Sequence, residues 1–405
     1  MKRRSIVPQI AGGLQVDSEK VFREMRVLPS VVDLKVNRGR IDAIQLLRAL
    51  AAIAVVFTHA TTRIGYVFPE GRGGSVLFSG GAGQCRVGDA GVDLFFVISS
   101  FVMLYVHWDD FNRPGAVSRF FRKRVARIVP LYWLLTTAAV SVMILAPGMF
   151  TTHYAALDPG WIVGSYMFLP IPAPGRGVSP VIGVGWTLNY EMFFYFAFGL
   201  SIVLPRPLAL RLLLASFTVL VGLGVALAPE APSAKFVTSW LLLEFLLGGG
   251  IAYWRLTGGK LSVPAAWAVA TASLAVLSAT VYWTPDEEGA GRFALWGIPA
   301  AGIVIAATVF DLGQGRWRRL AAVLGGASYS IYLFQVFALP MWGTVMSHLG
   351  FGTLPFDLNV VILTVLVVAS GVVGWAVVER PLSRAVKPIL AGRTHSDHPV
   401  GELIS

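Results

Sequence analysis

The amino-acid sequence predicts an all-α, polytopic membrane protein with about ten transmembrane helices. The chain is 55% hydrophobic and only 14% charged, whereas about a quarter of the residues in soluble domains are charged. Its mean hydropathy is +0.68. Apolar runs of about 20 residues recur along the whole length, which is what a helix needs to cross a hydrocarbon core of roughly 30 Å.

The apolar runs divide the chain into a membrane domain and two polar tails. We predict a cytoplasmic N-terminal tail at 1–40, a membrane domain at 41–384 and a cytoplasmic C-terminal tail at 385–405. The polar leader has no apolar core, so we expect no cleavable signal peptide. The predicted spans are 44–62, 89–107, 128–146, 186–204, 212–228, 236–254, 264–283, 293–311, 322–346 and 358–378.

The distribution of basic residues sets the expected orientation. With both termini inside, the inner loops and the C-terminal tail hold 17 Lys and Arg residues, against six in the outer segments. This excess is typical of cytoplasmic loops. It also accounts for the net charge of +11 without a nucleic-acid partner. We therefore expect a multi-pass protein of the inner (plasma) membrane.

Two further features limit the possibilities. Cys85 is the only cysteine, which excludes an intrachain disulfide and a cysteine-based metal cluster, and we predict no metal site. Trp161–Ile171 is apolar but short and is followed by prolines, so we expect an interfacial or re-entrant segment rather than a span.

The first span carries two ionisable residues, which are costly in hydrocarbon and therefore mark candidate functional positions. Arg48 and His59 are 11 residues apart, a rotation that returns to within about 20° of the same helix face. Along the axis they are separated by roughly 16 Å. The alternative is an arginine that snorkels inward and a histidine that rests at the outer interface.

Two carboxylates are expected at the depth of His59. Asp93 lies about one turn inside the second span, where Gly88 and Gly91 permit close helix approach, and Glu191 lies at a similar depth in the fourth. Two acids and an imidazole in one layer indicate a water-accessible cavity, in which a carboxylate can orient a histidine base. A structural hydrogen-bonded network is the alternative.

Basic residues crowd the inner edge of the third span. Topology alone explains their number. They also indicate an anion site, because guanidinium groups grip phosphates such as those of coenzyme A by paired hydrogen bonds. The residues are Arg119, Arg122, Lys123, Arg124 and Arg127.

Together these segments resemble the acyltransferase-3 family, especially its exopolysaccharide O-acetylating branch. The resemblance runs from about residue 41 to residue 384, and six motifs occur in the family's order. They lie at Arg48 and His59, Gly88–Ser99, Arg124–Trp133, Trp186–Glu191, Ser328–Leu333 and Glu379–Pro381.

The chain departs from the family pattern at three positions. Ser100 stands where the family usually has glycine, and Gln335 stands where it often has histidine. Asp42 lies six residues before Arg48 rather than three. The sequence therefore argues against a mechanism that needs a second intramembrane histidine.

The resemblance implies an enzyme that transfers an acyl group from acyl-CoA to an acceptor on the far side of the membrane. We expect acetyl-CoA as donor, with succinyl as the alternative group, and a sugar hydroxyl of an exopolysaccharide or lipid-linked glycan as acceptor. His59 would be the base, oriented by Asp93 or Glu191. Arg48 would hold the pantetheine arm or the thioester oxygen, and Arg124 and Arg127 would bind the nucleotide phosphates.

Two other classes of protein remain possible from the sequence. A glycan transporter or flippase could line its path with the same polar stripe, although we find no paired halves of the kind many transporters have. A sensor or scaffold could use the polar contacts structurally.

Overall fold

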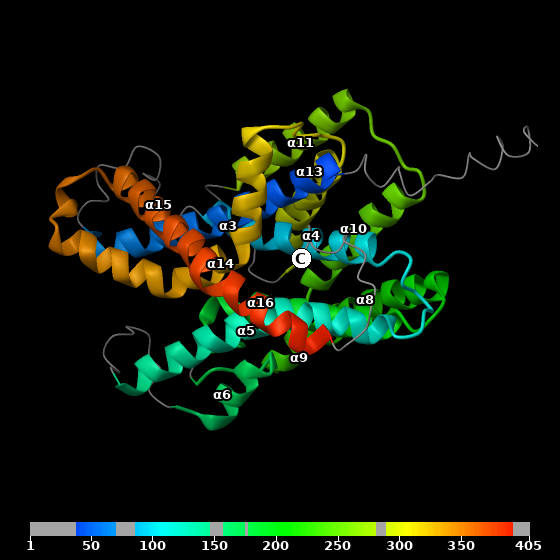
Figure 1. The fold of residues 1–405 in the computed structure, drawn as a ribbon, viewed down its shortest axis with the longest axis horizontal. Coiled ribbons are helices and arrows are strands. Elements are labelled where there is room, and N and C mark those ends of the chain that lie inside the picture. The colour runs from blue at the N-terminus through cyan, green and yellow to red at the C-terminus, as the bar shows by residue number, and fades with distance from the viewer. Residues whose placement is uncertain (1–37, 70–85, 146–156, 175–176, 281–288, 392–405) are drawn as a thin grey trace, which may run out of the picture. The chain divides into compact units, whose positions relative to one another are not determined.

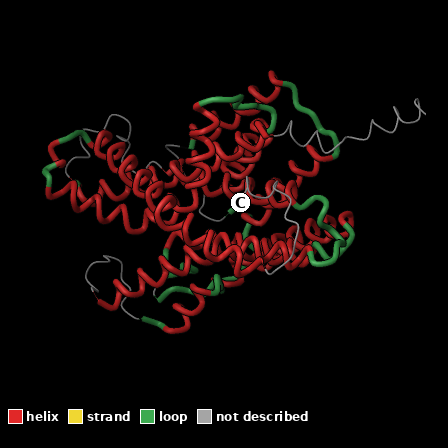
Figure 2. Tube along the Cα trace, in the orientation of Figure 1, coloured by secondary structure: helices red, strands yellow, loops and turns green. Residues whose placement is uncertain are grey.

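The computed structural model describes residues 38–69, 86–145, 157–174, 177–280 and 289–391. Within these ranges the elements are helices, joined by turns and short loops (Figures 1 and 2). The described residues from Arg40 onward belong to one compact unit, which contains the helices discussed below. The all-α prediction is confirmed for this part of the chain.

The long helices follow the predicted spans in order. They are α3 (Arg38–Val67), α4 (Ala90–Val106), α5 (Ala116–Leu145), α7 (Trp186–Ser201), α8 (Arg206–Leu227), α10 (Leu241–Leu256, after the short α9, Pro232–Val237), α11 (Val263–Ala279), α13 (Ile298–Ala307, after α12, Ala290–Arg292, and η5, Phe293–Gly297), α14 (Arg316–His348), and α15 (Phe356–Gly374), which continues through η7 (Trp375–Glu379) into α16 (Arg380–Ala391).

In the described ranges, eight helices are long and apolar enough to cross a membrane. This confirms the prediction of a polytopic membrane protein. The other two predicted spans coincide with α7 and α11, which have 16 and 17 residues. Because both are shorter than the roughly 20 residues of a typical crossing, the number ten stays a prediction.

The segment expected to stay out of the span count forms a short helix. α6 (Pro159–Tyr166) has eight residues, so it rises only about 12 Å and cannot cross the membrane. The chain reverses after it through Phe168, whose φ is +56°. Trp161 fixes the turn by donating its ring N–H to the Ser179 carbonyl at 2.7 Å.

Small residues bring α3 and α4 into backbone contact. A Cβ atom on Gly88 or Gly91 would overlap the carbonyl oxygens of Ala54 and Ala51, respectively. Lipid tails provide no hydrophobic drive for helix association, so such close packing is a main source of stability within a membrane. The predicted close approach at these two glycines is confirmed.

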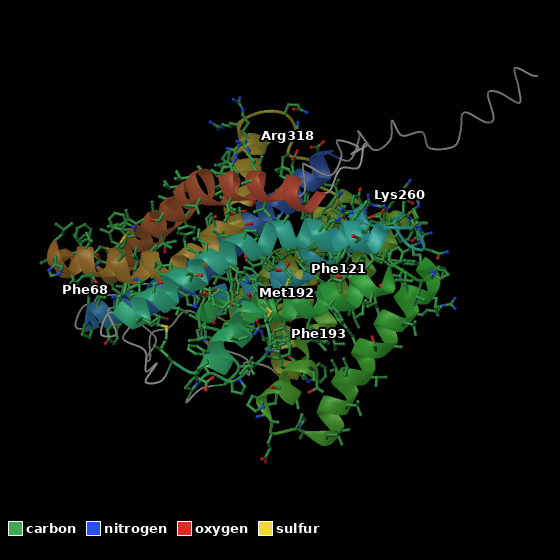
Figure 3. The ribbon with its side chains drawn as sticks, turned by 60° about the horizontal axis from the view of Figure 1, so that its bottom comes forward. Phe68, Phe121, Met192, Phe193, Lys260 and Arg318 are labelled. Atoms are coloured by element: carbon green, nitrogen blue, oxygen red, sulfur yellow. The ribbon has the colours of Figure 1, made fainter. Side chains whose placement is uncertain are left out.

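Glycines also allow α14 to pack closely against both α3 and α15. Gly325 faces the backbone of Gln45 on α3, and Gly371 of α15 faces the backbone of Ile331 on α14. Closer to the N-termini of both helices, Arg318 of α14 (labelled in Figure 3) donates to Asp42 of α3 at 2.6 Å. These contacts fix the position of the polar residues in the middle of α14.

Candidate active site

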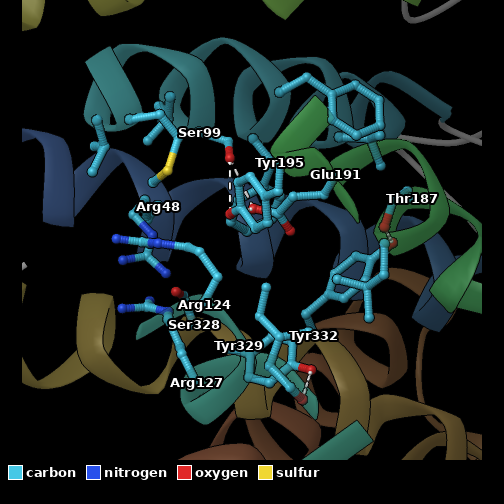
Figure 4. A pocket seen from close by; sticks show the side chains of 18 residues that line it. Arg48, Ser99, Arg124, Arg127, Thr187, Glu191, Tyr195, Ser328, Tyr329 and Tyr332 are labelled. Atoms are coloured by element: carbon cyan, nitrogen blue, oxygen red, sulfur yellow. Dashed lines mark hydrogen bonds between the residues drawn. The ribbon is translucent and has the colours of Figure 1, made fainter. Parts of the chain in front are cut away.

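Five helices contribute polar side chains to one pocket (Figure 4). Its ionisable groups, tyrosines aside, are three arginines and one glutamate, which leaves two positive charges in excess. Figure 4 shows the guanidinium groups gathered on one side and the carboxylate on another. The polar residues are Arg48 from α3, Ser99 from α4, Arg124 and Arg127 from α5, Thr187, Glu191 and Tyr195 from α7, and Ser328, Tyr329 and Tyr332 from α14.

The basic cluster of α5 divides between two environments. Arg124 and Arg127 are three residues apart and so share a helix face, which lines the pocket. Arg119 and Arg122 point elsewhere and donate to the Pro114 and Ser118 carbonyls of their own segment. Of these four arginines, only Arg124 and Arg127 therefore face the pocket.

Unused donor capacity remains on the arginine side of the pocket. Arg124 is buried, and its guanidinium carbon lies 6.0 Å from the centre of the Phe120 ring and 5.9 Å from that of Tyr195. Its Nε has no hydrogen-bond partner among the described residues. Arg48 donates to Gln45 Oε1 at a long 3.3 Å. Because buried guanidinium donors are normally satisfied, this side of the pocket is suited to an anionic ligand.

Glu191 is held by two hydroxyl groups. Ser99 Oγ donates to Glu191 Oε1 at 2.8 Å, and the Tyr195 hydroxyl donates to the same oxygen. Ser99 and Tyr195 also lie within 3.1 Å of each other. The carboxylate is thus fixed in the pocket wall, together with the arginines rather than with His59.

His59 lies outside the residues that line the pocket. Its Nδ1 is 2.8 Å from Gln335 Oε1, and Gln335 Nε2 donates to the Tyr332 carbonyl at 2.7 Å. Tyr332 itself lines the pocket. The imidazole is therefore connected to the pocket through one turn of α14.

Asp93 has a partner that we did not expect. Arg292 donates Nε to Oδ1 at 3.0 Å and Nη2 to Oδ2 at 2.9 Å, and the two side chains are 5% and 0% exposed. Glu244 of α10 is also fully buried and interacts electrostatically with both. The cluster joins α4, α10 and α12.

The expectation that Asp93 or Glu191 orients His59 differs from the structure. Both carboxylates are bound elsewhere, and the amide of Gln335 occupies the place next to the imidazole. Depth along a helix axis does not determine which side a residue faces. The contact of Arg292 could have been suspected, because a carboxylate within a membrane needs a cation and Arg292 directly precedes a predicted span.

Comparison with known proteins adds to this geometry. The family model described as an acyltransferase domain matches residues 41–379. The chain belongs to the acyltransferase-3 family. The sequence resemblance is thereby confirmed, and the protein is a multi-pass membrane acyltransferase.

Individual relatives support the same assignment. The exopolysaccharide production protein ExoZ of Rhizobium meliloti (strain 1021) is 32% identical over 316 residues, covering 76% of this chain and 95% of that protein. BcsY of Komagataeibacter xylinus, named as a membrane-bound transacylase, is 27% identical over 281 residues, covering 64% of this chain and 68% of that protein. No solved structure matches the chain.

Proposed function

We propose that this acyltransferase moves an acetyl group from cytoplasmic acetyl-CoA to a sugar hydroxyl of an exopolysaccharide or another cell-surface glycan. The observation that carries the donor assignment is the pocket in which Arg48, Arg124 and Arg127 converge. Guanidinium groups bind phosphates through paired, charge-assisted hydrogen bonds, and coenzyme A presents several phosphates. The acceptor class is supported by the name of the relative ExoZ.

The proposed roles follow the positions of the side chains. Arg124 and Arg127 hold phosphate oxygens of the donor, while Arg48 binds the pantetheine arm or supports the thioester oxygen. His59 lies 11 residues further along α3, roughly 16 Å away along the axis. An extended donor arm can bridge this distance, so coenzyme A stays at the inner side while its acyl group reaches the outer side.

His59 acts first as the general base and then as the general acid of the reaction. Its imidazole takes the proton from the sugar hydroxyl as the oxygen attacks the thioester carbonyl, which forms the new C–O bond and a tetrahedral oxyanion. The carbon–sulfur bond then breaks, and the departing thiolate takes the proton back from the imidazolium. The products are the acylated sugar and free coenzyme A.

The orientation belongs to the same proposal. With both termini in the cytoplasm, α5 begins on the inner side, where acyl-CoA is made, and the outer end of α3 faces the glycan. The excess of Lys and Arg in the loops assigned to the inside supports this arrangement.

The test is a transfer assay with the full-length protein in lipid nanodiscs. Radiolabelled acetyl-CoA or succinyl-CoA is mixed with deacylated surface polysaccharide or with its lipid-linked repeating unit, and label in the glycan is counted. We expect label from acetyl-CoA, at a rate well above that from succinyl-CoA. Faster transfer from succinyl-CoA would change the acyl group, and no transfer to either acceptor would refute the proposed function.

A further inference from the structure

We propose that Gln335 is a positioning residue that selects the tautomer of His59 and so leaves Nε2 as the atom that accepts the proton. This inference rests on the proposed function, because it assigns an atom to the base of that reaction. It is carried by the hydrogen bonds of the Gln335 side chain.

The orientation of the Gln335 amide is determined by α14 itself. One end of the amide meets the Tyr332 carbonyl at 2.7 Å, and a carbonyl oxygen can only accept a hydrogen bond. The end that faces it must therefore be the NH2 group. Turning the amide around would place two acceptor oxygens against each other and leave a fully buried amide unsatisfied, which is costly.

The orientation of the amide then determines the position of the imidazole proton. Gln335 Oε1 lies 2.8 Å from His59 Nδ1 and can only accept, so Nδ1 must carry the hydrogen. A neutral imidazole has one ring N–H, and Nε2 consequently keeps its lone pair. Among the residues that the structure describes, Nε2 has no hydrogen-bond partner.

The surroundings keep Gln335 in place. The Tyr332 hydroxyl donates to the Val184 carbonyl at 2.7 Å and lies 2.8 Å from Thr187 Oγ1, which holds this turn of α14 against α7 and η4 (Gly183–Gly185). The Gln335 amide thus orients the His59 imidazole, as a carboxylate does in many sites that use a histidine base. Unlike a carboxylate, the amide adds no buried charge.

Few charged groups lie near His59. On α3 itself, Arg63 is one turn away. From η3 (Arg86–Asp89), the ion pair of Arg86 and Asp89 approaches, because Gly88 packs against Thr58. Asp93 of α4 is bound to Arg292. α14 between Arg319 and His348, and α15 beyond Asp357, have no charged residue.

The decisive test compares Gln335→Met with Gln335→Glu. Methionine fills the space but cannot accept from Nδ1, so both tautomers should form. The rate constant kcat should then fall by roughly the share of imidazole lost to the Nε2–H tautomer, about a few-fold, which is well short of the 10²–10⁴-fold that loss of the whole general base would cost. Glutamate restores an acceptor for Nδ1 but loses the hydrogen bond from Gln335 Nε2 to the Tyr332 carbonyl, so activity should return in part. Its charge stabilises the imidazolium, and the acid limb of the pH–rate profile should move to higher pH.

A spectroscopic readout makes the test independent of turnover. Nitrogen-15 NMR of histidine-labelled protein in nanodiscs distinguishes protonated from bare ring nitrogens, and His59→Gln identifies the signals of His59. We expect a protonated Nδ1 and a bare Nε2 in the wild type, and a tautomer mixture in Gln335→Met. Asn359→Leu is the control, because it removes another buried amide, bonded to the Phe351 carbonyl at 3.0 Å, which should leave the His59 signals unchanged.

The possible outcomes separate this inference from the proposed function. An Nε2–H tautomer in the wild type, or a pH profile of Gln335→Glu that coincides with the wild-type profile, would overturn the role of Gln335. A wild-type protein that shows the expected tautomer but transfers no acyl group would refute the proposed function alone. If Gln335→Met does not fold, the wild-type NMR signals and the glutamate variant still decide.

Discussion

Arg124 and Arg122 lie two residues apart on α5, yet their surroundings differ. Arg124 is buried beside the aromatic rings of Phe120 and Tyr195, whereas Arg122 bonds to the backbone of its own helix. The charge of Arg122 is explained by its place at the inner membrane edge. Arg124, in contrast, lines the pocket in which we propose that the donor binds. This difference also provides a matched control within a single helix.

The double variant Arg124→Lys with Arg127→Lys should bind acyl-CoA more weakly. Lysine keeps the charge but loses the bidentate geometry, and a loss of about 1.5–3 kcal/mol in charge-assisted bonds corresponds to roughly 10- to 100-fold in affinity. Calorimetric titration of the purified protein measures this. Arg119→Lys with Arg122→Lys should bind as the wild type does, and equal effects of the two pairs would assign the whole cluster to topology.

His59→Gln should nearly abolish acyl transfer while acyl-CoA binding persists. Glutamine can keep a hydrogen bond to Gln335 but cannot accept a proton at neutral pH, so the rate should fall by about 10²–10⁴-fold. Single-turnover transfer and donor affinity are measured on the same preparation. Turnover close to that of the wild type would place the base elsewhere and make the polar stripe of α3 structural.

At the scale of elements, the Asp93–Arg292 pair connects helices that are far apart in sequence. Asp93 lies in the first turn of α4, and Arg292 ends α12, directly before the π-helical turn η5 that leads into α13. Their double hydrogen bond is almost completely removed from solvent. We therefore assign Asp93 to stability rather than to the orientation of His59.

Removing Arg292 alone should destabilise the protein more than removing both partners of this pair. A buried charge without its partner costs about 3–5 kcal/mol, whereas an apolar replacement of the whole pair is often close to neutral. Arg292→Leu should be the most severe variant, because Asp93 and Glu244 then share one buried region without a cation. Asp93→Leu should be milder, since Glu244 can take over the guanidinium.

Thermal unfolding in detergent, followed by tryptophan fluorescence, ranks these variants. We expect the midpoint of the double variant Asp93→Leu with Arg292→Leu to lie above that of Arg292→Leu alone. A double variant that is less stable than either single variant would show that the two residues contribute independently, contrary to a paired role.

At the scale of the whole molecule, the orientation of α7 and α11 decides how many times the chain crosses the membrane. Eight described helices are long enough to cross, and these two are shorter. If either failed to cross, every later loop would change sides, and the basic loops would no longer gather on one side.

Single cysteines placed in a Cys85→Ser background test both helices. Gly177→Cys and Pro205→Cys flank α7, and Lys260→Cys and Asp286→Cys flank α11. We expect positions 177 and 286 to react with an impermeant maleimide from outside, and positions 205 and 260 only after the membrane is opened. Labelling of both positions of a pair from one side would contradict the ten-span topology.

The sequence alone determined the class of the protein and the order of its helices. Apolar runs of crossing length are local features, because each helix satisfies its own backbone hydrogen bonds within the bilayer. Gly88 and Gly91 indicated the close contact of α3 and α4 for a related reason, since only small residues permit it. The family motifs likewise remain recognisable without coordinates.

The tertiary structure decided which of the singled-out residues meet. Hydropathy gives a residue's depth in the membrane but not its partner, because the partner depends on how helices rotate and pack. Glu191 therefore lies with the three arginines, Asp93 with Arg292, and His59 with Gln335. In the sequence, Gln335 was only a departure from the family pattern. In the structure, Gln335 contacts both His59 and the Tyr332 carbonyl, which is the basis of the tautomer proposed for His59.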